Sequence, residues 1–339
     1  MIQKKDGIVL ILILFLIAIL SVVVLESLKQ SEINGFACVY ERNTVDAYHR
    51  LKSVESLEKA LLIKDAKNNN YDTLFDVWNN KEKMEKLNGY DKKYFSKINF
   101  RMEDECGKFP INMIADKKNG KLYRSVFMNL LMDEPFNLKK VRAAKIVFSV
   151  WYWIDKDGFE KQNKTAMMLV SEDIDIDKMF SAKVRNAPIR TLGELFFIKT
   201  IDKKMLYSSK NKKGLFNLLT PYCFNGKINI NTAPKEIIMA LVSSDISQDT
   251  KKEFANSVVK YRSDEFHRDL LKKPDWYQSK MPGFNDIILP NDIITTSSHW
   301  FRLIINDNSS APSLNAVEIL HREKKKSEYK VKTVYKEVY

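Results

Sequence analysis

The residues best suited to chemistry are the carboxylates of two short acidic segments, WIDKDGFE and SEDIDID. They are Asp155 and Asp157 in the first segment and Glu172, Asp173, Asp175 and Asp177 in the second. Ca²⁺ takes about six to eight oxygen ligands, often from carboxylates separated by one residue on a tight loop. Neither segment fits an EF-hand loop, because the sixth and twelfth positions counted from Asp173 are Lys178 and Val184. The residues alone leave two alternatives, a calcium site or two solvated loops.

The chain has three cysteines, Cys38, Cys106 and Cys223. Cys106 and Cys223 occupy similar contexts, CGKFPIN and CFNGKIN, each with a Gly-Lys turn and an Ile-Asn pair. Spacing does not settle the connectivity. An odd number of cysteines in an oxidising compartment leaves at least one thiol free or paired with another chain. A Cys106–Cys223 bridge is therefore a hypothesis that the sequence raises and does not decide.

Enzyme motifs are absent from the sequence. It contains no HExxH, GxSxG or GxGxxG pattern and no Gly-Lys-Ser/Thr phosphate loop, and its four histidines are too scattered to suggest zinc. A helix pair after Asn231 could be a helix-hairpin-helix DNA-binding motif, but its connector SSDISQD has no glycine and two acids. The net charge of +13 is spread along the chain in Lys-rich turns. We therefore expect no enzymatic activity, no small-molecule substrate and no nucleic-acid partner.

The element that must position the rest is an apolar N-terminal segment. A polar leader, MIQKKDG, precedes eighteen residues, Ile8 to Leu25, that are apolar except for Ser21. At about 1.5 Å per residue this segment is about 27 Å long, enough to span a bilayer core. A secretory signal is cut after its apolar core, whereas the plausible cut site here, Gly7, lies in front of it. This layout is typical of a type IV prepilin processed between Gly7 and Ile8, and the alternative is an uncleaved signal anchor.

Both interpretations give the same topology. Lys4 and Lys5 stay in the cytoplasm by the positive-inside rule, and everything after Glu26 lies outside it. We therefore expect a single-pass inner-membrane protein whose C-terminal bulk is periplasmic.

The helical pattern continues from the anchor to about Ala66 and ends at Asn68-Asn69-Asn70. Its apolar face consists of Ile33, Phe36, Tyr40, Ala47, Leu51, Val54 and Leu61. Strand-like segments follow at 94–102, 109–114, 300–305, 316–321 and 329–338, the last with the lysines of an edge strand. Between them the pattern is helical at 123–131, 141–154 and 254–262, with helix starts at a Thr191–Glu194 capping box and at Thr232 and Pro234.

These elements predict an α+β fold, in which a pilin-like long N-terminal helix packs on a small antiparallel sheet and a large all-α domain is inserted between the strands. The predicted organisation is a leader at 1–7, a transmembrane segment at 8–25, the pilin-like helix and first strands at 26–115, the inserted helical domain at 116–292 and the remaining strands at 293–339. We expect the helix face from Ile33 to Leu61 to contact the sheet and sister subunits.

Taken in order, several segments resemble the K-type minor pseudopilins of type II secretion systems, the general secretion pathway protein K family. After the prepilin-like start come DTLFDVWN at 72–79 and MEDECGKFPINMI at 102–114. WIDKD at 153–157 and SED at 171–173 resemble the family's acidic loop, and SHWFRL at 298–303 resembles its late strand. The most specific matches are RNAPIRTLGELFFIKTI at 185–201 and GKININTAP at 226–234. The resemblance covers nearly the whole chain.

The resemblance implies a structural protein that caps the tip of a periplasmic pseudopilus and supports export of folded proteins across the outer membrane. Its partners would be I-type and J-type minor pseudopilins, the pseudopilus shaft and the prepilin peptidase, with cleavage after Gly7 and methylation of Ile8. Other pilin subunits carry Glu at the fifth mature position, where this chain has Leu12. A tip subunit has no subunit above it to pair with such a Glu, so its absence fits the tip.

The resemblance also implies Ca²⁺ as a cofactor, held by Asp155, Asp157, Glu172 and Asp173. The chain departs from the family by lacking a Gly-Ala before Glu172 and by lengthening the loop. Two rival interpretations remain for the whole chain. One is a minor pilin that primes a type IV pilus, whose head lacks the RNAP…NTAP helical block. The other is a signal-anchored periplasmic binding protein, which would not depend on prepilin peptidase.

Overall fold

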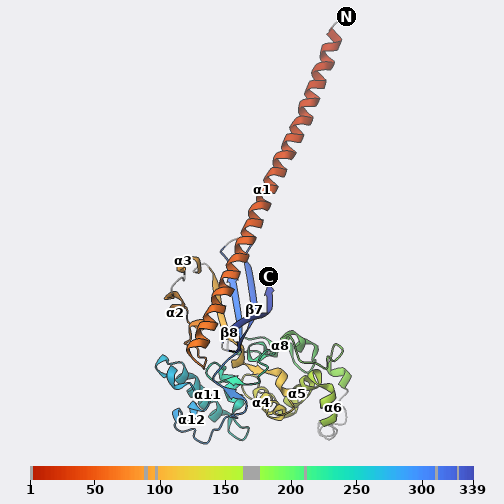
Figure 1. Ribbon diagram of the computed structural model, residues 1–339. Coiled ribbons are helices and arrows are strands. Elements are labelled where there is room, and N and C mark those ends of the chain that lie inside the picture. Colours follow the sequence, from red (N-terminus) through yellow and green to blue (C-terminus); the bar gives the residue numbers. More distant parts are fainter. Residues whose placement is uncertain are drawn as a thin grey trace.

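A helix of 66 residues, α1 (Gln3–Asn68), dominates the molecule. The computed structural model describes residues 3–87, 91–95, 98–162, 176–209, 212–309, 312–326 and 328–339. α1 contains no proline and is about 100 Å long at 1.5 Å per residue. It projects far beyond the rest of the protein, with the N-terminus at its free end (Figure 1). Its last third packs on a globular head, as the amphipathic pattern predicts.

The sheet that receives α1 is four-stranded and antiparallel, in the order β1-β6-β7-β8. Its strands are β1 (Asn99–Asp104), β6 (Trp300–Asp307), β7 (Leu314–Lys325) and β8 (Glu328–Val338). Successive side chains of a strand face opposite sides, and buried residues alternate along β6 for this reason. β8 lies at an edge of the sheet, as predicted from its lysines.

The core between α1 and the sheet is apolar. Leu51, Val54 and Leu62 of α1 are completely buried and belong to one cluster with Phe301 and Leu303 of β6. Trp78, in the 3₁₀ helix η1 (Val77–Asn79), packs edge-on against Phe301 with ring centroids 5.2 Å apart. The segment after α1 therefore closes one side of this core.

A large, mainly helical region connects β1 to β6 and lies at the end of the molecule opposite the N-terminus (Figure 1). Its α-helices are α4 (Gly120–Met132), α5 (Lys140–Ile154), α6 (Lys156–Gln162), α8 (Lys203–Leu206), α9 (Leu215–Leu218), α10 (Lys235–Leu241), α11 (Gln248–Arg262) and α12 (Trp276–Lys280). Its 3₁₀ helices are η2 (Glu105–Gly107), η3 (Ile111–Ala115), η4 (Ile176–Met179), η5 (Leu192–Phe197) and η6 (Glu265–Leu270). This arrangement confirms the predicted fold class.

The insertion is not purely helical. Two short parallel pairs lie within it, β2 (Phe109–Pro110) with β3 (Leu219–Thr220) and β4 (Ile228–Asn229) with β5 (Ile294–Thr295). Because β5 pairs with β4, the chain re-enters the main sheet only at Trp300. The pairs bring the segments around positions 110, 220, 228 and 294 together although they are distant in sequence.

Several local predictions were wrong. The segment predicted as a strand at 94–102 begins in a short helix, α3 (Lys92–Phe95), and β1 starts only at Asn99. The predicted strand at 109–114 is a two-residue strand followed by η3. Helices and strands as short as these contain too few residues for a periodic pattern to distinguish one from the other. A further short helix, α2 (Lys81–Glu85), lies between η1 and α3.

Two predicted helix starts also differ from the structure. Thr191 precedes η5, a 3₁₀ helix, and its side chain makes no capping hydrogen bond. Glu194 instead pairs with Arg185 and accepts from the Arg190 backbone N–H at 2.8 Å. Thr232 does not cap α10, because its hydroxyl donates to Asp104 at 2.6 Å and Pro234 occupies the N-cap position. The Thr232 hydroxyl is thus used by a distant residue, whereas Glu194 is used by two arginines close to it in the sequence.

Candidate functional site

The exposed apolar surface of α1 is the most distinctive feature of the protein. The large apolar side chains from Ile8 to Leu25 are 47 % to 68 % exposed, and this part of α1 is long and apolar enough to cross a membrane. The exposure continues beyond it at Leu28, Ile33, Phe36, Val39, Tyr40, Val45 and Tyr48. Contiguous exposed apolar surface marks a site of contact with a membrane or another protein.

The predicted apolar face of α1 is divided into two parts. Ala47, Leu51, Val54 and Leu61 are buried against the head. Ile33, Phe36 and Tyr40 are 51 %, 69 % and 58 % exposed, so the described part of the head does not bury them. We call the second part the assembly stripe, comprising Ile33, Phe36, Val39 and Tyr40. The apolar face of this helix therefore packs on the protein's own sheet from Ala47 onward and is exposed from Ile33 to Tyr40.

The residues of the predicted processing site lie on α1 near its free end. Gly7 and Ile8 are exposed, and a side chain at Gly7 would meet no other group within 4 Å. Leu12 is 64 % exposed and continues the apolar surface without interruption. The third cysteine, Cys38, is also exposed on α1, beside the assembly stripe.

The predicted calcium ligands are only partly described by the structure. Asp155 ends α5, and its Oδ1 accepts from the Gly158 backbone N–H at 2.9 Å. A side chain at Gly158 would displace the Asp155 carboxylate from this position. Asp157 is exposed and accepts from the Asn186 amide at 3.2 Å. Glu172 and Asp173 lie outside the described residues.

A buried polar network joins the sheet to the inserted region. Asp104, at the end of β1, accepts from Ser298 Oγ at 2.5 Å, from Thr232 Oγ1 at 2.6 Å and from the Asn229 amide at 3.1 Å. Burial raises the pKa of Asp104 to about 6, although the bonds from Ser298 and Thr232 oppose this shift. We call Asp72, Asp104, Asn229, Asn231 and Ser298 the domain junction.

The two asparagines of the GKININTAP segment hold the domain junction together. The Asn229 amide also donates to Ser298 Oγ at 2.8 Å and to the Asp72 carbonyl at 3.3 Å. The Asn231 amide donates to the carbonyls of Asp72 and Leu271 and accepts from Trp276 Nε1 at 2.9 Å. The segments singled out at 72–79, 102–114, 226–234 and 298–303 thus meet at one buried place, which accounts for their particular residues.

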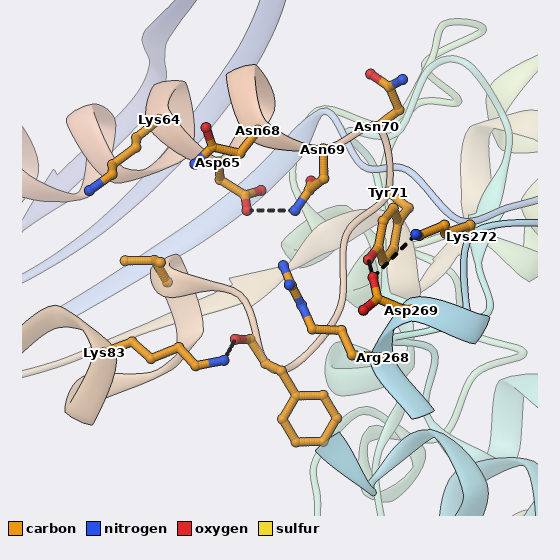
Figure 2. A pocket seen from close by; sticks show the side chains of 12 residues that line it. Lys64, Asp65, Asn68, Asn69, Asn70, Tyr71, Lys83, Arg268, Asp269 and Lys272 are labelled. Carbon is orange, nitrogen blue, oxygen red and sulfur yellow. Dashed lines mark hydrogen bonds and ion pairs between the residues drawn. The ribbon is translucent and has the colours of Figure 1, made fainter. Parts of the chain in front are cut away.

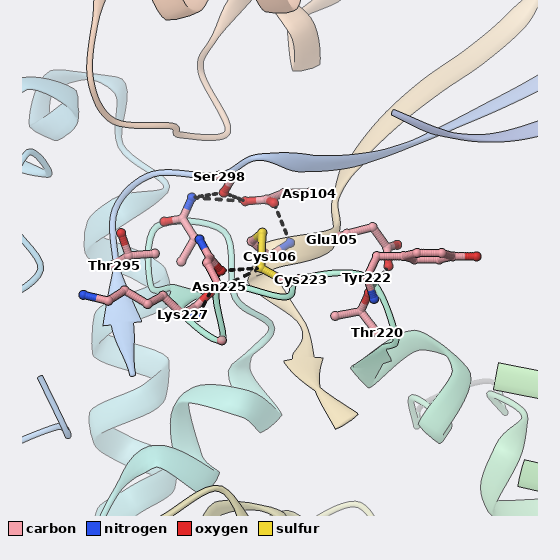
Figure 3. The surroundings of a disulfide bond; sticks show 12 residues. Asp104, Glu105, Cys106, Thr220, Tyr222, Cys223, Asn225, Lys227, Thr295 and Ser298 are labelled. Atoms are coloured by element: carbon pink, nitrogen blue, oxygen red, sulfur yellow. Dashed lines mark hydrogen bonds between the residues drawn. A yellow bond between two sulfur atoms is a disulfide. The ribbon is translucent and has the colours of Figure 1, made fainter. Parts of the chain in front are cut away.

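Cys106 and Cys223 form a disulfide beside this junction, with their Cα atoms 5.4 Å apart (Figure 3). The Cys106 backbone N–H donates to Asp104 Oδ1 at 2.8 Å, so the bridge and the polar network share one residue. Trp300 and Ile319 of the sheet pack with the two cysteines in a small cluster. The bridge therefore fastens the insertion to the end of the sheet.

A second charged cluster lies where α1 ends. One carboxylate oxygen each of Asp65, Asp72 and Asp76 lies within 4.8 Å of the others, and all three residues are buried. Arg322 of β7 donates to both Asp72 oxygens, at 2.6 and 2.7 Å, and to Asp65 at 3.3 Å. Arg268 of η6 donates to Asp76 at 2.6 Å. We call the three aspartates the acidic cluster.

A cavity of about 670 Å³ opens beside the acidic cluster, and Asp65 and Arg268 line it. Figure 2 shows the Arg268 side chain reaching from η6 toward Asp65 and Asn69 at the end of α1, with Tyr71, Asp269 and Lys272 at its other side. Lys83 closes the remaining side and donates to the Phe75 carbonyl at 2.9 Å. The end of α1 and the insertion are thus joined by charged groups.

Sequence reasoning did not identify the residues of the domain junction and the acidic cluster as sites. The signal available was the asparagines of an otherwise apolar stretch, KININTAP, because a buried amide needs partners. Nothing in the sequence indicates that Arg322, in a basic C-terminal segment, is buried with Asp65 and Asp72. Only the crossing of β7 over the end of α1 brings them together.

Neither a protein-family model nor a curated protein sequence matches this chain. Among solved structures, the chain is similar to a chain in the crystal structure of the GspK–GspI–GspJ complex from the type 2 secretion system of enterotoxigenic Escherichia coli. The match covers 88 % of this chain and 98 % of that one, with a TM-score of 0.59 and 17 % sequence identity. At this identity the likeness establishes a common fold over the matched part of the chain.

Proposed function

We propose that this protein is a K-type minor pseudopilin that caps the tip of a type II secretion pseudopilus and supports export of folded proteins. The observation that carries the proposal is the fold shared with a chain of the GspK–GspI–GspJ complex over 88 % of this chain and 98 % of that one. The ordered segments resembling the K-type family, from DTLFDVWN to SHWFRL, support it independently of the fold.

The proposed partners are I-type and J-type minor pseudopilins, which contact the assembly stripe. The stripe is apolar, lies on a rigid helix and is left uncovered by the protein's own head. Apolar area removed from water contributes about 25 cal/mol per Å², so a partner helix that covers Phe36 and Tyr40 gains a substantial part of its binding energy there. The C-terminal third of α1 cannot serve as this surface, because it already packs on the protein's own sheet.

Two features support a place at the tip and not in the shaft. Leu12 stands at the position where shaft subunits carry a Glu that pairs with a neighbouring N-terminus, and a charge without a partner costs about 2.5–3.5 kcal/mol at the bilayer centre. The insertion makes the head larger than a sheet and helix alone, and this bulk would collide with neighbours in a closely packed shaft.

Binding to the partners is tested with the full-length protein in detergent and purified I-type and J-type subunits. Phe36→Glu should weaken the complex, because it places a charge in the centre of the assembly stripe. Val141→Glu on α5 is the matched control, since Val141 is 67 % exposed and Phe36 is 69 % exposed. Equal binding by both variants, or no complex with the wild type, would remove the proposed role.

Processing distinguishes the proposal from a signal-anchored periplasmic binding protein. The mature chain should begin at Ile8, methylated, only in cells that contain prepilin peptidase, and a chain that begins at Met1 in both strains would favour the signal anchor. A minor pilin of a type IV pilus would be processed in the same way. It would instead be required for pilus assembly and would not bind the I-type and J-type subunits.

We also propose Ca²⁺ at the acidic loop. The donor set suits it chemically, because Asp155, Asp157, Glu172 and Asp173 offer the carboxylate oxygens that a hard cation takes. The glycine at position 158 supports a built turn, since a side chain there would displace the Asp155 carboxylate. Bound Ca²⁺ would neutralise these acids and link Asp155 and Asp157, after α5, to Glu172 and Asp173.

A further inference from the structure

The acidic cluster carries more negative than positive charge. Its members, Asp65 on α1 and Asp72 and Asp76 in the following segment, pair with two buried or half-buried cations of the described residues, Arg322 and Arg268. Asp72 and Asp76 each have a close guanidinium partner at 2.6 Å. The guanidinium contact of Asp65 is longer, 3.3 Å to Arg322, which is already engaged with Asp72. If all five groups are ionised, one negative charge remains, and it falls on Asp65.

The Asn69 amide gives a second indication of how this charge is relieved. Its nitrogen can lie 3.3 Å from Asp65 Oδ1. Turning the amide over lets the nitrogen donate to the Tyr71 carbonyl at 2.8 Å and the oxygen accept from Arg268 at 3.0 Å. The better-bonded orientation then points the amide oxygen at the Asp65 carboxyl. Two oxygens that face each other attract only when one of them carries a proton.

The remaining charged groups around the cluster do not neutralise it. Of the lysines that line the cavity, Lys83 pairs with Glu265 and Lys272 pairs with Asp269, while Lys64 is exposed. His299 lies just before β6. Burial and the charge of Arg322 lower its pKa below the usual value, although the charge of Asp72 opposes this shift. His299 therefore supplies no further positive charge at neutral pH.

Electrostatics at Asp65 agree with this geometry. Burial raises the pKa of Asp65 to about 7, helped by Asp76 and Asp72 and opposed by Arg322. Burial also raises the pKa of Asp76, although the Thr73 backbone N–H and Arg268 hold it down. The raised pKa thus falls on Asp65, the carboxyl whose contact with a guanidinium is the longest in the cluster.

We propose that the acidic cluster binds one proton at Asp65 and makes the attachment of the insertion to α1 dependent on pH. The cluster joins four parts of the chain, α1 through Asp65, the 69–76 segment, η6 through Arg268 and β7 through Arg322. With the proton, charges balance and the four parts are held together. Without it, an uncompensated buried charge weakens the same contacts.

The sign of the effect follows from the two states. The carboxyl of an unfolded aspartate titrates near 3.9, below its value of about 7 in the folded protein. Between about pH 3.9 and about pH 7, folding therefore takes up a proton at Asp65. The stabilisation that this proton provides is complete at acid pH and is lost as the pH rises through about 7. Above this range the loss is complete, and stability no longer varies with pH through Asp65, although the ionised carboxyl still destabilises the cluster.

The experiment compares the wild type with Asp65→Asn in the full-length protein in detergent, from pH 5 to pH 9. Asparagine resembles the protonated carboxyl, so the variant should unfold with release of about one proton fewer than the wild type near pH 6. Asp104 also has a raised pKa, but it is present in both proteins and cancels in the comparison. Asp307→Asn is the matched control, because Asp307 is equally buried and pairs with Arg50 at 2.6 Å far from the cluster.

A direct readout covers the case in which Asp65→Asn fails to fold. Infrared difference spectra of the wild type should contain the band of a buried protonated carboxyl at pH 6 that disappears by pH 9. The hydrogen-exchange protection factors of segments 65–76 and 265–272, which are corrected for the intrinsic rise of exchange with pH, should fall over the same range. Asp307→Asn should retain both changes. Protection factors that do not vary with pH, or an Asp65→Asn variant with the proton release of the wild type, would overturn the proposal.

Discussion

The domain junction predicts that one asparagine amide holds the insertion on the sheet. Asn229 is completely buried, and its amide nitrogen reaches Ser298 Oγ, Asp104 Oδ2 and the Asp72 carbonyl at 2.8, 3.1 and 3.3 Å. Its carbonyl oxygen accepts from the Asn231 backbone N–H at 3.0 Å. Asn229→Ala removes all of these bonds together and leaves the buried partners in place.

The magnitude follows from what is left unpaired. A hydrogen bond to a charged group contributes about 1.5–3 kcal/mol, and a buried carbonyl without a partner costs about 1–3 kcal/mol. Asp104 keeps its bonds from Ser298 and Thr232, so only part of its stabilisation is lost. We expect a loss of about 3–5 kcal/mol in the free energy of unfolding, or roughly 5–10 °C in Tm for a chain of this size.

The assay is thermal unfolding of the full-length protein in detergent, followed by tryptophan fluorescence. Asn217→Ala is the control, because Asn217 is exposed and its side chain accepts from Ser208, nine residues away, at 2.7 Å. Asn229→Ala should also increase hydrogen exchange at both β4 and the end of β1, since Asn229 bonds to both segments. If the two alanine variants unfold at the same temperature, the asparagine does not fasten the domains and the reasoning fails.

Four further outcomes can be measured. Reducing the Cys106–Cys223 bridge, which spans 117 residues, should lower the stability by about 4–5 kcal/mol through the released chain entropy, whereas an unchanged denaturant midpoint after reduction would mean that the bond does not form. Leu51→Ala should cost about 2–5 kcal/mol in chemical denaturation, because Leu51 is completely buried under the sheet. Burial raises the pKa of Glu105, but Lys108 and Arg302 outweigh it and hold that pKa near 2. Its stabilisation is therefore present above the usual glutamate pKa and lost as the pH falls toward 2, so the wild type's stability advantage over Glu105→Gln should shrink between pH 5 and pH 2. Millimolar Ca²⁺ should raise Tm in the wild type and not in Asp155→Asn, and equal shifts in both would exclude the loop as the binding site.

The pattern of residues along the chain was sufficient for the long elements. The apolar run from Ile8 to Leu25 and the spacing of Ala47, Leu51 and Val54 required one continuous helix with a buried face. The alternation in 300–305, 316–321 and 329–338 likewise required strands, and lysines in the last one predicted the edge of the sheet. These features extend over many residues, so their periodicity outweighs local preferences.

Short elements and caps were not determined in this way. Threonine is a favourable N-cap residue, but the Thr232 hydroxyl donates to Asp104, which lies 128 positions earlier in the sequence. The segment at 92–95 is helical although its aromatic residues favour a strand. In both cases a contact with a distant segment, or the few residues available, decides the conformation.

The sequence by itself therefore determined that the chain has an apolar N-terminal segment, an amphipathic helix and two groups of strands around a helical region, because periodicity and composition are properties of neighbouring residues. Only the tertiary structure decided that the assembly stripe stays uncovered, that Asn229 and Asn231 join Asp72 and Asp104, and that Arg322 lies among buried carboxylates. Buried polar groups find their partners across the fold, and the distances between those partners are set by how α1, the sheet and the insertion pack, not by their order along the chain.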